Sequence, residues 1–116
     1  MDVESLIQAA YQHALRELAQ AGFDVNGACL EASVLMHKYL REHGVRAELV
    51  RREMPDGGHW TIRTPAGEYD PTISAWPNAP VRVRGLYLVE PDSPHHEWPE
   101  TSVDEKRAYS FWYGEE

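Results

Sequence analysis

The sequence predicts one α+β domain in which N-terminal helices pack on an antiparallel β-sheet. Three observations predict this class: apolar residues recur with helical spacing before residue 44, they alternate with a period of two after it, and the chain has 116 residues. That length is the usual size of a single domain, so residues 1–116 are expected to form one unit. Hydrophobic residues make up 42% and charged residues 26%, which is typical of a globular protein.

The first helix is expected over residues 3–21, where apolar side chains recur at steps of three and four before Gly22. A turn follows, and Asn26 can cap the helix that comes next. That second helix is expected over residues 28–43. Cys29 therefore lies on its first turn.

The alternating part of the chain is expected to form strands joined by Pro- and Gly-containing turns, at 47–52, 59–63, 68–70 and 81–89. Short turns between successive strands favour antiparallel pairing. The basic residues from Arg46 to Arg52 alternate with apolar ones, which indicates the solvated side of a strand. A proline-rich loop at 91–99 leads to a terminal helix at 102–112, with Ser102 as its cap.

Charge and segment composition narrow the partners. Lys and Arg number 11 against 19 Asp and Glu, a net charge of −8, so the chain is a poor candidate for nucleic-acid binding. No apolar run approaches the roughly 20 residues that cross a bilayer, and the first residues lack the order of a signal peptide. We therefore expect a cytoplasmic protein that binds neither nucleic acid nor a membrane.

Cys29 is the single cysteine of the chain, which excludes an internal disulfide and a thiolate-based zinc site. At a helix N-terminus, the backbone N–H groups and the positive end of the helix dipole favour the thiolate, which is the nucleophilic form. An adjacent imidazole would activate it further. The alternative is an inert buried thiol, because free cysteines are among the most buried residues.

His59 and Asp70 flank a tight turn at residues 65–67. If the strands are joined by a two- or four-residue loop, Asp70 lies opposite Thr61, and His59 is its diagonal neighbour on the same face. Asp70 could then orient the imidazole, as the third member of a catalytic triad does. A three-residue loop would place the two side chains on opposite faces.

Taken together, Asn26 to Ser33 (NGACLEAS), Gly58 to Ile62 (GHWTI) and Glu68 to Thr72 (EYDPT) resemble the transglutaminase-like superfamily of papain-type cysteine enzymes. The similarity spans about residues 24–76 and is greatest to short bacterial and phage members, including the leader peptidases of lasso-peptide biosynthesis. The resemblance implies a helix-on-antiparallel-sheet core. It also implies a catalytic triad of Cys29, His59 and Asp70.

The chain departs from this family at the cysteine. Many members carry an amide side chain just before the cysteine and tryptophan just after it, where this chain has Ala28 and Leu30. The backbone N–H of Cys29 remains as an oxyanion donor. Asn26 is a candidate second donor or, alternatively, a turn residue and cap.

The remaining candidates have weaker support. Trp60 and Trp76 are expected to line a substrate groove or, alternatively, to pack in the core. His95 and His96 are adjacent, so their side chains should point apart, and no third ligand lies near them in the sequence. We therefore expect no metal and no cofactor. His37 is expected at a surface or boundary position of the second helix.

The function expected first is thiol-dependent amide chemistry on a peptide or protein. Water as acceptor would give a cysteine peptidase or glutamine deamidase, and an amine acceptor would give an acyltransferase. Hydrolysis is favoured, because a small open domain excludes water poorly. The alternative is a non-catalytic interaction domain, such as a phage accessory protein, whose acidic surface meets a basic partner. A metal hydrolase using His59, His95 and His96 is a third hypothesis.

Overall fold

A computed structural model describes residues 2–24, 28–55, 57–71 and 86–114. The α+β class is confirmed, with helices α1 (Val3–Gln20), α2 (Cys29–Glu42) and α3 (Glu105–Tyr113). The antiparallel sheet has the order β4-β3-β2-β1-β5 and comprises β1 (Glu48–Met54), β2 (Gly57–Thr64), β3 (Gly67–Asp70), β4 (Tyr87–Leu88) and β5 (Glu100–Thr101). A short 3₁₀ helix, η3 (Pro94–Glu97), lies between β4 and β5.

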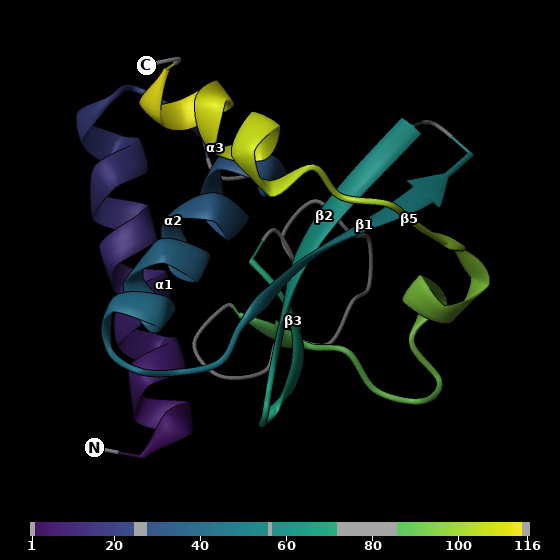
Figure 1. Ribbon diagram of the computed structural model, residues 1–116. Coiled ribbons are helices and arrows are strands. Elements are labelled where there is room, and N and C mark those ends of the chain that lie inside the picture. The colour runs from purple at the N-terminus through teal and green to yellow at the C-terminus, as the bar shows by residue number, and fades with distance from the viewer. Residues whose placement is uncertain (1, 25–27, 56, 72–85, 115–116) are drawn as a thin grey trace.

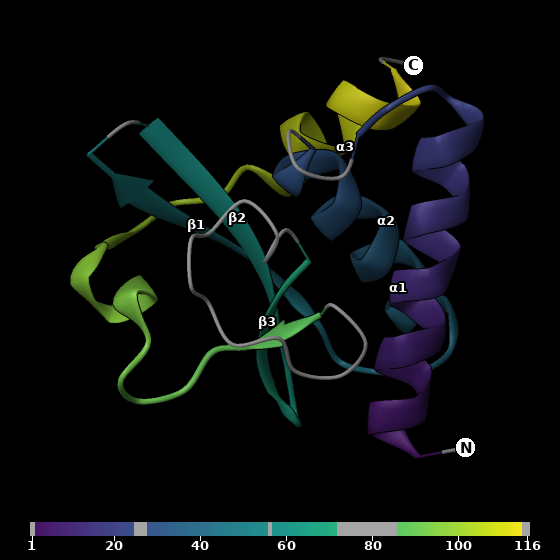
Figure 2. The same ribbon diagram turned by 180° about the vertical axis from the view of Figure 1, so that it is seen from behind.

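The molecule is layered. Helices α1 and α2 lie side by side on one side of the sheet, and the segment that carries η3 crosses the other side (Figures 1 and 2). Apolar residues of α1, α2 and the inner strands form one core: Ile7, Ala10, Ala14, Leu18, Ala32, Leu35, Met36, Leu40, Ile62 and Tyr69. Burying one such aliphatic side chain contributes about 1.5–3 kcal/mol, which fixes the helices on the sheet. None of the helices in the described part of the chain is long and apolar enough to cross a membrane.

The hairpin between β2 and β3 fixes the register that matters for the site. Thr64 pairs with Gly67, so the loop is the two-residue Pro65-Ala66 turn. The next pairs bring Ile62 opposite Tyr69, and continuing this register brings Thr61 opposite Asp70. The condition for His59 and Asp70 to share a face is therefore met.

Local expectations have different outcomes, and some fall outside the described residues. The last helix is capped by Asp104, whose side chain accepts a hydrogen bond from the Arg107 N–H, and not by Ser102. Within the expected strand 81–89, residues 81–85 lie outside the described residues, and only Tyr87–Leu88 is a strand. The N-cap of α2 is Ala28, whereas Asn26 lies outside the described residues.

Two polar side chains expected near the surface are buried. Arg52 is 5% exposed, because its guanidinium is enclosed by Glu68 and the segment around η3. His37 is fully buried, with its Nε2 donating to the Ala47 carbonyl and its Nδ1 accepting from the Tyr109 hydroxyl. In both cases the partners come from segments distant in the sequence.

Candidate active site

Cys29 is the first residue of α2 and is partly exposed, as a nucleophile must be. Helices begin with backbone N–H groups that lack intrahelical acceptors, and a Ser, Thr, Asp or Asn N-cap usually binds one of them. Here the N-cap is Ala28, which has no side-chain acceptor. The first turn of α2 therefore presents backbone donors and the positive end of the dipole beside the sulfur.

His59 lies near the start of β2 and is hydrogen-bonded to Asp70, with 2.6 Å between Nε2 and the carboxylate Oδ2. This contact confirms the predicted pairing across the hairpin. His59 also forms a side-chain hydrogen bond with Cys29. The Nε2 of the ring faces Asp70. The imidazole thus bridges the carboxylate and the thiol.

The charge state of His59 follows from these neighbours. Burial lowers its pKa, but the hydrogen bonds to Asp70 and Cys29 and the charge of Asp70 outweigh burial and raise the pKa to about 9. A raised histidine pKa means that the site stabilises the imidazolium form. An imidazolium next to sulfur is the partner that a thiolate requires.

The sequence analysis placed His95 only in the third hypothesis, a metal hydrolase, and did not predict its contact with Asp70. His95 lies on η3, is fully buried, and its Nε2 donates to the same Asp70 Oδ2 at 2.9 Å. His96 points away, is exposed, and contacts the Glu90 carbonyl, as expected for adjacent side chains. No third ligand lies near His95 in the sequence, but the fold brings Asp70 and His59 next to it.

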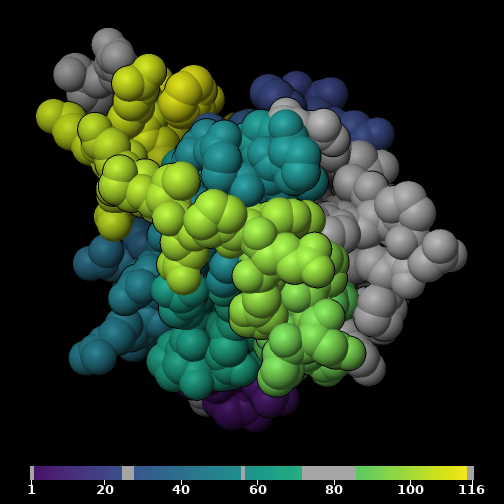
Figure 3. Space-filling model, turned by 90° about the vertical axis from the view of Figure 1, so that its right-hand side faces the viewer, coloured from purple at the N-terminus to yellow at the C-terminus, as the bar shows by residue number. Residues whose placement is uncertain are grey.

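Aromatic rings enclose the two histidines. The Tyr87 ring stacks on His95 at 5.5 Å between centroids, with an interplanar angle of 19°. The ring centroid of Trp98 lies 5.1 Å from that of His95 and 5.8 Å from that of His59. Figure 3 shows this segment, in green, on the surface beside teal atoms of the neighbouring strands. Asp70, whose carboxylate contacts His95, is fully buried.

A buried ion pair anchors the same segment. Arg52, the cross-strand partner of His59, donates to both carboxylate oxygens of Glu68, at 2.8 and 3.1 Å. Its Nη1 also donates to the backbone carbonyls of His95 and Trp98, at 2.9 and 3.1 Å. The backbone that positions His95 is thereby tied to β1.

The predicted groove residues have separate outcomes. Trp60 packs against a second apolar cluster made by residues of α2, β1 and α3, among them Val34, Leu49 and Ala108. Its role as a groove wall stays a prediction. Trp76 and Asn26 lie outside the described residues. Trp98 also lies beside the site, with its ring centroid 5.8 Å from that of His59.

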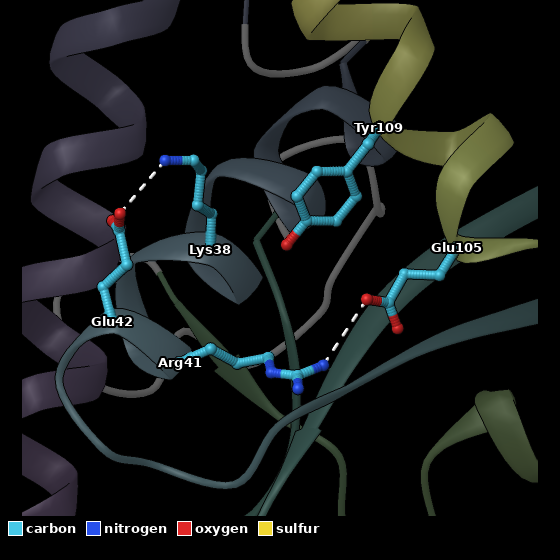
Figure 4. Close-up of a pocket in the computed structure, with 5 residues that line it drawn as sticks. All are labelled: Lys38, Arg41, Glu42, Glu105 and Tyr109. Atoms are coloured by element: carbon cyan, nitrogen blue, oxygen red, sulfur yellow. Dashed lines mark hydrogen bonds and ion pairs between the residues drawn. The ribbon is translucent and has the colours of Figure 1, made fainter.

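A separate hollow lies between α2 and α3 (Figure 4). Its charged side chains pair with one another: Lys38 with Glu42 at 3.1 Å and Arg41 with Glu105 at 3.4 Å. Exposed pairs of this kind stabilise a fold by about 0–1 kcal/mol. We therefore interpret this hollow as a helix–helix contact.

Comparison of the chain with protein-family models, curated proteins and solved structures found no match. The function is therefore inferred from the geometry of Cys29, His59 and Asp70.

Proposed function

We propose that the chain is a transglutaminase-like thiol hydrolase that acts on amide bonds of a peptide or protein in the cytoplasm. The observation that carries this proposal is that His59 is hydrogen-bonded both to Asp70 and to Cys29. The alternative, a binding domain without chemistry, requires no such contact between sulfur and imidazole. A binding domain could also have its histidine turned to solvent, whereas His59 is only 7% exposed.

The reaction divides into two acyl transfers. The Cys29 sulfur attacks the carbonyl carbon of the amide, and the carbonyl oxygen takes the charge while backbone N–H groups at the start of α2 stabilise it. His59 then gives its proton to the leaving nitrogen, the C–N bond breaks, and a thioester remains on Cys29. Asp70 holds the imidazole in the orientation needed for both proton transfers.

Water completes the cycle. His59 takes a proton from water, the resulting hydroxide attacks the thioester carbonyl, and the C–S bond breaks to release the acid and regenerate the thiol. If the attacked amide is a glutamine side chain, the first leaving group is ammonia. If it is a backbone amide, the leaving group is the amine of the peptide's C-terminal fragment. Cys29 and His59 serve both cases.

The test is the rate at which iodoacetamide alkylates Cys29 near neutral pH, followed by mass spectrometry. An ordinary free cysteine is only a few per cent thiolate at pH 7, so pairing with imidazolium can raise the rate by up to about thirtyfold. We expect His59→Ala to slow alkylation by about tenfold or more, while His96→Ala, which removes an exposed histidine, leaves it unchanged. Equal rates in all three proteins would refute the proposal.

Product analysis then identifies the hydrolysis. An unstructured protein such as casein is incubated with the wild type and with Cys29→Ser, and both ammonia and new peptide ends are measured. Ammonia alone indicates a deamidase, and new peptide ends indicate a peptidase. We expect one of the two with the wild type and neither with Cys29→Ser.

A further inference from the structure

Three buried ligand atoms converge beside the thiol. One atom each from His59, Asp70 and His95 lies within 4.8 Å of the other two. His95 and Asp70 are fully buried, and the His59 side chain, at 9% exposed, is the member that still reaches solvent. Two imidazole nitrogens and one carboxylate oxygen form a ligand set that suits Zn²⁺.

The cluster is held in place before any ion arrives. Tyr87 stacks on the His95 ring, Trp98 packs against both imidazoles, and buried Arg52 holds the backbone carbonyls of His95 and Trp98. Packing and backbone hydrogen bonds of this kind hold side chains in a fixed position, as a built site requires. His95 is the new element here, because the thiol chemistry proposed above uses only His59 and Asp70.

The spacing is close to what zinc needs. Bonds of 2.0–2.1 Å in tetrahedral geometry separate neighbouring ligand atoms by about 3.3 Å. The two nitrogens now lie 2.6 and 2.9 Å from Asp70 Oδ2. Each nitrogen would therefore move away from this oxygen by about 0.4–0.7 Å to admit the ion. Three protein ligands leave a fourth position for water.

We propose that His59, Asp70 and His95 form a Zn²⁺ site. Zinc on the Nε2 of His59 replaces its hydrogen bond to Asp70. Zinc binding at this site does not depend on the function proposed above.

Binding is tested with the 116-residue chain and Zn²⁺ alone by isothermal titration calorimetry, and with Co²⁺ by absorption spectroscopy. We expect one ion per chain, with cobalt bands typical of four-coordinate geometry. His95→Gln should weaken zinc binding by about tenfold or more, while His96→Gln, the matched control, should leave the affinity unchanged. Cys29→Ser should bind zinc as tightly as the wild type, which keeps the proposal testable if His95→Gln does not fold.

Zinc affinity that survives His95→Gln, or that is lost in Cys29→Ser, would overturn the site, because either result places the ion on the sulfur or elsewhere. If zinc binds but Cys29 is alkylated equally fast in the wild type and in His59→Ala, the zinc site stands and the proposed thiol function is refuted.

Discussion

Removing the buried guanidinium of Arg52 should be among the most destabilising single changes in the fold. Arg52 and Glu68 have side chains that are 6% and 8% exposed, and two hydrogen bonds join them. Replacing Arg52 by Met keeps most of the side-chain volume but leaves the Glu68 carboxylate buried without its main partner. Breaking a buried pair in this way costs about 3–5 kcal/mol. The carbonyls of His95 and Trp98 lose their donor as well, which adds to the loss.

The assay is urea unfolding of Arg52→Met beside Arg51→Met. Arg51 is the neighbour on the same strand, is 32% exposed, and pairs with Glu53 at 2.8 Å, so its loss should cost about 0–1 kcal/mol. The double variant Arg52→Met/Glu68→Leu removes the stranded carboxylate and should be more stable than Arg52→Met alone. A cost below about 1 kcal/mol for Arg52→Met, or a double variant less stable than the single one, would refute this interpretation.

Two further predictions concern pH and backbone conformation. Burial lowers the pKa of His37 below its ordinary 6.5, so the unfolded chain binds a proton more readily than the folded chain does. The free energy of unfolding should therefore be highest above pH 6.5. Below that pH it should fall by up to about 1.4 kcal/mol per pH unit. Urea unfolding at pH 7.5 and 5.5 should show a smaller loss in His37→Gln than in the wild type and His43→Gln, and equal losses would contradict it. Gly67 has a φ of 129°, and an added Cβ would lie 2.9 Å from Leu88 Cδ1, so Gly67→Ala should lower stability by about 1–3 kcal/mol. Gly58→Ala, whose Cβ meets only the movable end of Arg51, should cost less in the same assay, and the reverse order would refute the argument.

The sequence predicted the parts of the site that depend on local pattern. The period of the apolar residues placed Cys29 at the start of a helix, and a turn of countable length placed His59 and Asp70 on one face. These relations follow from the geometry of one helix and one hairpin. They require no knowledge of how distant segments pack.

The parts that were missed depend on the path of the chain between elements. His95 reaches Asp70, 25 residues away in sequence, because the segment after β4 folds back over the sheet. Arg52 is buried for the same reason, although its strand alternates as a solvated one would. No periodicity marks such a contact. One available signal was chemical: two adjacent histidines within a proline-rich loop, one of which had to point inward if the loop packed on the domain.

The most direct test of the central claim is to look for an acyl group on Cys29. The protein is mixed with p-nitrophenyl acetate, quenched in acid, digested and examined by mass spectrometry. We expect acetylation of Cys29 that hydroxylamine removes, as it does a thioester. This acetylation should form far more slowly in His59→Ala than in His96→Ala. Acetyl groups found only on lysines, or equal acetylation of Cys29 with and without the His59 imidazole, would contradict it.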